Sequence, residues 1–217
     1  MILRANFIPP AKSFAEVVRD LGDIPLERIR AFPPPGSATE ADLNQPGNKL
    51  CELIDGVLVE KAVGARESLL GAYINRQIGS FIEGDDLGVI LGADGLIWVD
   101  AEQLRAPDGT FIPWSAFPDE ELPEETWWTV APVLAIEVLS PSNTVAEINR
   151  KLRELFSAGC ELAWVIDPRT QSAKVYTSAK RFKELDIHGT LDGGKVLPGF
   201  KLPLADLFAA SKRRKKK

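Results

Sequence analysis

Glu137 is the residue whose surroundings in the sequence point most directly to chemistry. It lies inside the apolar run PVLAIEVL, residues 132–139, which is typical of a central strand buried on both faces. A carboxylate in such a strand is costly unless it is protonated, paired with a cation or bound to a metal ion. The sequence therefore predicts either a functional acid or a paired carboxylate at the rim of the strand.

Asp108 and Lys151 gain meaning only in combination with Glu137. Asp108 precedes Gly109, so it is equally typical of a turn residue that caps local backbone amides. Lys151 falls on a predicted helix and forms an i,i+4 pair with Glu147, which suits a solvated surface as well. Together, however, two carboxylates can hold a divalent cation beside a scissile phosphate, and a lysine can position or deprotonate the attacking water.

The other chemistry-bearing residues exclude several kinds of site. His188 is the only histidine, so a His-rich zinc site or a conventional serine triad is hard to assemble. Cys51 and Cys160 are far apart and stand beside apolar residues, which favours reduced, partly buried thiols over a disulfide framework. We therefore expect oxygen ligands and a hard cation, Mg²⁺ or Mn²⁺.

The charge of the chain is unevenly distributed. The 217 residues carry a formal net charge of -5, but the tail at 212–217 is entirely basic, and without it 20 basic groups face 31 acidic ones. An acidic body argues against tight non-specific binding to duplex DNA. The basic tail is interpreted either as a solubilising end or as an arm that seeks phosphates.

The sequence divides into three segments. Residues 1–49 are rich in proline and predict an N-terminal arm with one short amphipathic helix, on which Phe14, Val17, Val18 and Leu21 share a face. Residues 50–208 form the main domain, and residues 209–217 form the basic tail. The start of the chain lacks the pattern of a signal peptide, and no apolar run approaches the roughly 18 residues of a membrane span. We therefore expect a cytoplasmic protein that does not bind membranes.

The main domain alternates between strand and helix patterns. The predicted elements are a hairpin at 51–60 around Asp55-Gly56, a helix over 69–82, strands at 88–91 and 96–99, a strand from 109, an exposed loop at 115–129, the buried strand at 132–139, a helix capped at 142–144 and ended by Gly159, strands at 162–166 and 173–177, and a closing turn near Leu207-Phe208. This order predicts an α/β (α+β) fold.

Several motifs follow one another in order between about residues 50 and 177. They are CELIDGVLVE at 51–60, APD at 106–108, IEVLSPS at 136–142, Arg150-Lys151, Gly159, WVIDP at 164–168 and Val175-Tyr176. This ordered set resembles the Uma2 family, formerly DUF820, which is assigned to the PD-(D/E)xK nuclease superfamily. The LPGF segment at 197–200 extends the resemblance toward residue 208.

The resemblance implies a restriction-endonuclease-like fold, in which helices flank a mixed central sheet. It implies Asp108 and Glu137 as metal ligands, Lys151 as the catalytic lysine and Glu52 as a supporting acid. The sequence departs from the superfamily at two points. The lysine expected two residues after the acid is Leu139, so Lys151 must reach over from the next helix, and a histidine that many relatives carry is replaced around 66–67.

Two functions follow as expectations. The first is a Mg²⁺- or Mn²⁺-dependent endonuclease that hydrolyses the phosphodiester bonds of DNA. The second is a catalytically degenerate nuclease fold that binds protein or nucleic acid, which the acidic body and the missing nearby lysine favour. Nuclease-type folds often work as dimers, because two active sites address two strands, and Trp127 and Trp128 of the exposed loop are candidate anchors for a homodimer interface.

Overall fold

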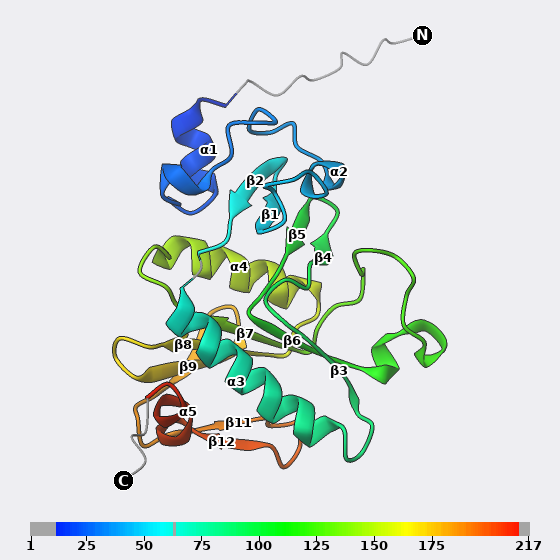
Figure 1. Cartoon of the computed structure of the whole chain (residues 1–217), viewed down its shortest axis with the longest axis vertical. Helices are drawn as coiled ribbons and strands as arrows, with labels where there is room; N and C mark the ends of the chain where they lie inside the picture. The colour runs from blue at the N-terminus through cyan, green and yellow to red at the C-terminus, as the bar shows by residue number, and fades with distance from the viewer. Residues whose placement is uncertain (1–11, 63, 213–217) are drawn as a thin grey trace.

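The computed structural model describes residues 12–62 and 64–212 (Figure 1). The basic residues 213–217 and the N-terminal stretch 1–11, on which the signal-peptide prediction rests, lie outside the described residues. The helices are α1 (Phe14–Asp20), α2 (Glu40–Leu43), α3 (Ala65–Ile82), α4 (Val145–Ala158) and α5 (Leu204–Ala210), with short 3-10 turns at Leu26–Arg28, Trp114–Ala116 and Pro118–Glu120. The strands are β1 (Cys51–Ile54), β2 (Val57–Glu60), β3 (Gly88–Leu91), β4 (Ile97–Asp100), β5 (Gln103–Arg105), β6 (Gly109–Pro113), β7 (Leu134–Val138), β8 (Leu162–Asp167), β9 (Ser172–Ser178), β10 (Arg181–Leu185), β11 (Thr190–Asp192) and β12 (Lys201–Pro203).

A six-stranded mixed sheet forms the centre of the molecule, in the order β10-β9-β8-β7-β6-β3. Only β7 and β8 run parallel, because α4 connects them as a crossover, and the other neighbours are antiparallel. All five residues of β7 are buried, as its apolar sequence predicted. Glu137 therefore belongs to a strand from which water is largely excluded.

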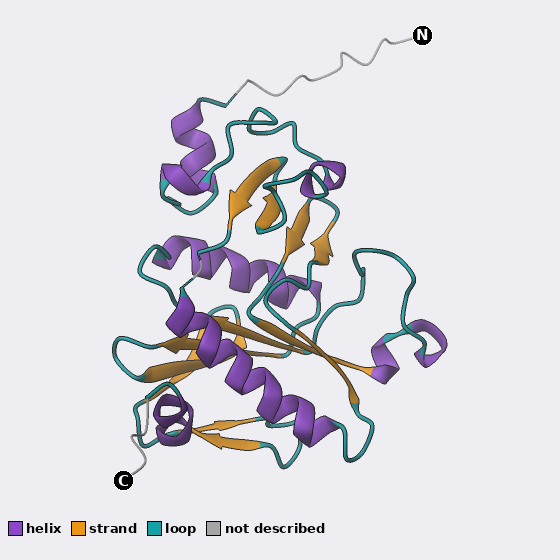
Figure 2. Cartoon of the chain, in the orientation of Figure 1, coloured by secondary structure: helices purple, strands orange, loops and turns teal. Residues whose placement is uncertain are grey.

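Helices cover both faces of this sheet (Figure 2). On one face, Ile136, Val138 and Trp164 pack with apolar residues of α3, α5 and the β11–β12 hairpin. On the other face, Ala135 and Val165 pack with Ile148, Leu152 and Leu155 of α4. Because successive strand residues alternate in direction, Glu137 shares the α4 face with Ala135.

A second sheet, in the order β2-β1-β5-β4, lies beside α4 and carries α1 and α2 at its outer end (Figure 1). Its β1–β2 hairpin turns at Asp55-Gly56, where both residues have positive φ, as the Asp-Gly signal predicted. Residues 106–108 lead directly from β5 of this sheet into β6 of the central sheet. The two sheets therefore meet at Asp108.

The N-terminal arm holds the start of α4. Gly22, with φ +95°, packs so tightly that a Cβ there would lie 2.5 Å from the backbone nitrogen of Glu147. Its carbonyl accepts a hydrogen bond from Thr144, the residue that caps α4. Arg28 donates to both carboxylate oxygens of Glu147, at 2.7 and 3.0 Å, and this pair is buried. Residues 20–28 thus fix the first turns of the helix that carries Lys151.

Most predicted elements are confirmed. Helix α1 occupies the predicted arm helix, and α4 begins after Thr144 and ends at Gly159 in the left-handed conformation. The predicted closing turn is wrong, because the segment around Leu207 and Phe208 is helix α5. Strands β5, β10, β11 and β12 were not anticipated from the sequence. The division into arm, main domain and tail stays a prediction.

The interpretation of Trp127 and Trp128 as exposed anchors is also wrong. Most of residues 118–126 are exposed, but both tryptophans are half-buried and pack against apolar clusters of the domain. Trp128 accepts a backbone hydrogen bond from Trp98 and meets Phe117 edge to face. These side chains are used within the fold, so they give no support to dimerisation.

None of the helices in the described part of the chain is long and apolar enough to cross a membrane.

The contact between the arm and α4 predicts a strong effect of substituting Gly22. Gly22→Ala should lower the free energy of unfolding by about 3 kcal/mol, because it adds backbone strain at positive φ and forces a side chain into the α4 backbone. Gly47 is the matched control, since its φ is +94° but a Cβ added there would meet no atom within 4 Å. Gly47→Ala should cost only about 1–2 kcal/mol. Urea unfolding measures both, and equal losses would contradict the packing of the arm on α4.

Candidate active site

Asp108 and Glu137 come together because of strand register. In the β6–β7 pair, Gly109 lies opposite Ile136. Asp108 directly precedes β6, and its Oδ2 accepts a hydrogen bond from the backbone N–H of Val138, the residue that follows Glu137 on β7. The side chains of both acids line one small cavity. The convergence of these two acids, expected from sequence, is therefore present in the structure.

The carboxylate of Asp108 does not cap its own turn. Its Oδ2 accepts a hydrogen bond of 2.8 Å from the backbone N–H of Val138, on β7. Its backbone carbonyl accepts another from the side chain of Asn75 on α3, at 2.8 Å. Oδ1 lies 3.4 Å from the ammonium of Lys61. Contacts with other elements of the fold therefore position Asp108. Its Oδ1 is directed at the ammonium of Lys61, which lines the same cavity.

The side chain of Lys151 also belongs to the site, and it is buried rather than solvated. Its Nζ lies 2.6 Å from Oε1 of Glu137 and 2.9 Å from Oε1 of Glu52. All three residues are no more than 8% exposed. The structure therefore brings together the four residues that the resemblance singled out, and Lys151 reaches Glu137 from α4 as the departure at Leu139 required.

A series of largely buried ion pairs restricts the position of Lys151. Glu52 contacts Arg105 at 3.0 Å, since continuing the β1–β5 register places these two residues opposite each other. Arg105 also contacts Glu154 on α4, at 2.6 Å, and Glu154 in turn contacts Arg150 at 2.6 Å. Alternating charges thus tie α4 to the second sheet, and they leave Lys151 little freedom to move.

Burial and these charges set the protonation states. Burial raises the pKa of Glu137 to about 7, with Lys151 opposing this shift and Asp108 adding to it. Burial alone would also raise the pKa of Glu52, but Lys151 and Arg105 outweigh it and hold that pKa well below its usual range. For Lys151, burial would lower the pKa, yet Glu137 and Glu52 raise it above its ordinary value. Lys151 therefore stays an ammonium at neutral pH.

The cavity at these residues has room for about one small ion or water molecule, with a volume of about 20 Å³. Oε1 of Glu137 is buried and, although 2.6 Å from Lys151, has no hydrogen bond of acceptable geometry in the described residues. In the same described ranges, no three His, Cys, Asp or Glu side chains gather closely enough to form a metal site by themselves. Mg²⁺ does not need three, because it is commonly bound by one or two carboxylates together with water and substrate phosphate. The donor set thus fits a hard divalent cation.

Two features of the site were not foreseen. Lys61, directly after β2, points its ammonium at the carbonyls of Ala93 and Ala106 and at Asp108. Nothing in the sequence distinguished it from a surface lysine following a strand.

The expected Glu147–Lys151 pair is absent among the described contacts, because Glu147 is bound by Arg28 and Lys151 by the site carboxylates. That prediction was wrong because it considered the helix without its neighbours.

Comparison with solved structures supports the fold. A structure described as a "putative nuclease belonging to DUF820 from Anabaena variabilis ATCC 29413" superposes with a TM-score of 0.69. The match covers 78% of this chain and 96% of the other, at 19% sequence identity. At this identity the likeness shows the fold alone, and it confirms the predicted fold class. None of the curated proteins matches the chain.

A family comparison identifies the chain from its sequence. The sequence model of Uma2, described as "Putative restriction endonuclease", matches residues 40–205. This range includes all four site residues, and it excludes the part of the arm that contains Gly22 and Arg28. Because the match spans most of the sequence, the chain belongs to the Uma2 family.

Proposed function

We propose that this protein is a nuclease that hydrolyses phosphodiester bonds of DNA with the help of Mg²⁺ or Mn²⁺. The family's description and that of the structural neighbour support a nuclease-type activity. The observation that carries the proposal is the buried constellation of Asp108, Glu137 and Lys151 around one cavity. Such a set combines ligands for a hard cation with a fixed positive charge, which phosphodiester hydrolysis requires.

Asp108 and Glu137 would hold the cation. When bound, the cation supplies an activated water and neutralises charge on the scissile phosphate. Oδ2 of Asp108 accepts a hydrogen bond of 2.8 Å from Val138, whereas Oδ1 faces the ammonium of Lys61 at 3.4 Å, so Oδ1 is the less tightly held oxygen and the one that we assign to the cation. Glu137 contributes its buried carboxylate, whose Oε1 lies 2.6 Å from Nζ of Lys151, and the β6–β7 pairing beside the two acids fixes their backbones.

Lys151 acts in this proposal as a hydrogen-bond donor and a positive charge. Because its pKa is raised, it keeps its proton and does not serve as a general base at neutral pH. Its ammonium can hold a water molecule or a phosphate oxygen beside Glu137 and stabilise the negative charge that develops there. Glu52 is a positioning residue, since its Oε1 lies 2.9 Å from Nζ of Lys151 and it also binds Arg105 and the backbone N–H of Ala106.

Local charge explains how an acidic protein could accept DNA. The cavity is lined by four carboxylates, Glu52, Asp108, Glu137 and Glu147, and by three cationic side chains, Arg28, Lys61 and Lys151. Their formal sum is -1, and a divalent cation would change it to +1. The site would therefore attract a phosphate only after the cation has bound, despite the acidic body.

The alternative is a nuclease fold that binds DNA or protein without cleaving it. The structure favours this alternative in one respect, because Lys151 is engaged by two carboxylates and lacks a free proton-accepting form. The two functions differ in a simple observable. A degenerate module would bind its partner equally well with and without divalent cations and would leave DNA intact.

The first prediction concerns cleavage by site variants. Asp108→Asn and Glu137→Gln should each lower the rate of Mg²⁺-dependent DNA cleavage by about 100-fold or more, because each removes a charged ligand. Lys151→Met should lower kcat by a similar factor. Cleavage of linear and circular DNA with Mg²⁺, Mn²⁺ or EDTA provides the measurement.

Asp206→Asn serves as the matched control, since Asp206 is an exposed carboxylate on α5 that does not line the cavity. It should cleave DNA at the rate of the unmodified protein. Cleavage that persists in EDTA, or that survives Asp108→Asn and Glu137→Gln, would rule out the proposed metal site.

The second prediction is a pH dependence of cation binding. A carboxyl group whose pKa is raised to about 7 keeps its proton at lower pH, and a cation must displace that proton to bind. Affinity for Mn²⁺ should therefore fall about tenfold per pH unit below pH 7 and level off above it. Isothermal titration calorimetry at pH 5.5 to 8.5 measures this, with Asp206→Asn as a control. An affinity that does not change between pH 6 and 8 would contradict a cation at Glu137.

A further inference from the structure

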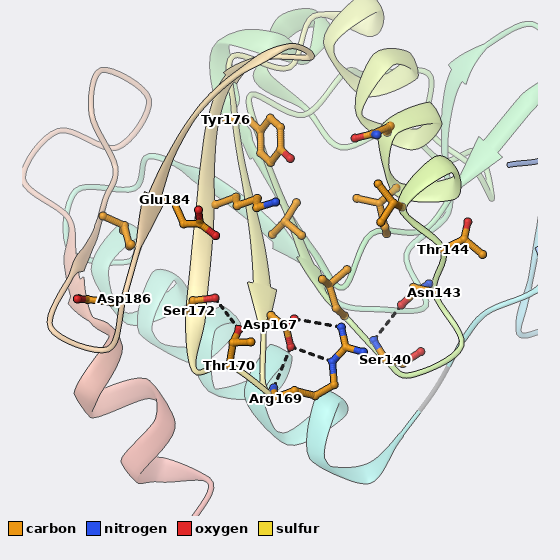
Figure 3. A pocket seen from close by; sticks show the side chains of 17 residues that line it. Ser140, Asn143, Thr144, Asp167, Arg169, Thr170, Ser172, Tyr176, Glu184 and Asp186 are labelled. Atoms are coloured by element: carbon orange, nitrogen blue, oxygen red, sulfur yellow. Dashed lines mark hydrogen bonds and ion pairs between the residues drawn. The ribbon is translucent and has the colours of Figure 1, made fainter.

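A larger cavity lies next to the proposed cation site. Its volume is about 510 Å³, within the range of pockets that hold small molecules. Asn143 and Ile148 line both this cavity and the small one at Glu137, so the two are adjacent. Figure 3 shows its walls, with Tyr176 and Glu184 from β9 and β10 on one side and Asn143 and Thr144 at the start of α4 on the other. We call this cavity the base pocket.

Strand register links the floor of the base pocket to Glu137. Glu137 pairs with Val165, Val165 pairs with Lys174, and Lys174 pairs with Glu184. Directly paired residues point to the same face, so this row crosses the sheet on the side that α4 covers only in part. At about 4.8 Å per strand, Lys174 lies roughly 10 Å from Glu137 and Glu184 one strand further. The pocket is therefore within reach of a DNA strand whose phosphate lies at the cation site.

The interior of the base pocket suits a flat, uncharged ring. Val165, Ile148 and Tyr176 are each no more than 8% exposed overall, and they supply an apolar and aromatic lining. Two cationic side chains line the pocket: Arg169, at one end, is neutralised by Asp167 through contacts of 3.0 and 3.1 Å (Figure 3), and Nζ of Lys174 lies 4.9 Å from the centroid of the Phe182 ring. A nucleobase is a ring of this kind, and stacking against such side chains stabilises unstacked bases.

The rim of the pocket carries the carboxylate of Glu184. Glu184 is exposed and forms no ion pair within the described residues, so its carboxylate is available as an acceptor. It lies close enough to Tyr176 to help raise the pKa of that phenol, in addition to the effect of burial. An ionised carboxylate accepts hydrogen bonds from an amino group and repels carbonyl oxygens and phosphates.

We propose that the base pocket holds one unstacked nucleobase with an exocyclic amino group, adenine, cytosine or guanine, from the strand whose phosphate binds the cation held by Asp108 and Glu137. The amino group donates to Glu184, and the ring lies against Val165, Ile148 and Tyr176. The inference rests on the proposed function for the position of the phosphate, but the recognition of the base is independent of catalysis.

Binding of nucleosides tests the pocket without any cleavage. The full chain in EDTA is titrated with deoxyadenosine, deoxycytidine, deoxyguanosine and thymidine, and binding is followed by calorimetry and by NMR shifts. Amino-bearing nucleosides should bind about tenfold more tightly than thymidine, which is the usual effect of one hydrogen bond to a charged acceptor. Equal affinity for thymidine and deoxycytidine would overturn the proposal.

Two variants with matched controls identify the site of binding. Glu184→Gln should abolish the preference against thymidine, whereas Glu161→Gln, another exposed glutamate away from the pocket, should leave it unchanged. Thr170→Trp fills the mouth of the pocket and should weaken all nucleosides, whereas Thr190→Trp on β11 should not. Undiminished binding to Thr170→Trp would overturn the proposal. If that variant fails to fold, Glu184→Gln still decides.

Cleavage assays separate this inference from the proposed function. Oligonucleotides carry a single abasic residue at successive positions around the cleaved bond, and one position should lower kcat/KM about tenfold or more. Cleavage that is indifferent to every abasic position would refute the pocket and leave the nuclease assignment intact. Conversely, nucleoside binding that depends on Glu184 in a protein without nuclease activity would support the base pocket and refute the proposed function.

Discussion

The contact on which the site depends is the buried ammonium of Lys151 between Glu137 and Glu52. These carboxylates belong to different sheets, and both are largely withdrawn from water. Loss of Lys151 would be strongly destabilising, because Glu52 would keep Arg105 but Glu137 would have no ion-pair partner among the described residues. The lysine thus joins β7, α4 and β1 at one point, and the same charge that holds the architecture faces the cavity where a phosphate would lie.

The sequence was sufficient to predict the parts of the site that follow from local pattern. An acid in an apolar strand had to have a partner, and Glu137 does. The capping residues of α4 and the Asp-Gly turn behaved as their backbone chemistry requires. The roles of Asp108 and Lys151 came only from the resemblance, because a turn aspartate and a helical lysine carry no distinctive local signal. Their convergence depends on β6–β7 register, which is a long-range property.

The features that sequence reasoning missed are those decided by distant partners. Glu147 looked like the natural partner of Lys151, but a guanidinium 119 residues earlier in the chain binds it with two hydrogen bonds. The ammonium of Lys61 is positioned by hydrogen bonds to backbone carbonyls on two other loops. Trp127 and Trp128 were interpreted as exposed anchors because their loop is polar, yet both side chains pack against apolar clusters of the domain. Periodicity within one element cannot reveal which surface meets it.

The arm has a consequence for how this protein can change over evolutionary time. The guanidinium of Arg28 and the carboxylate of Glu147 compensate each other in a buried setting, and Arg28 lies outside the residues 40–205 that match the family model. Loss of either partner alone would strand a buried charge. Relatives without this arm must therefore carry a different residue at the position of Glu147 or supply a cation from elsewhere, so the two positions should covary among homologues that retain the arm.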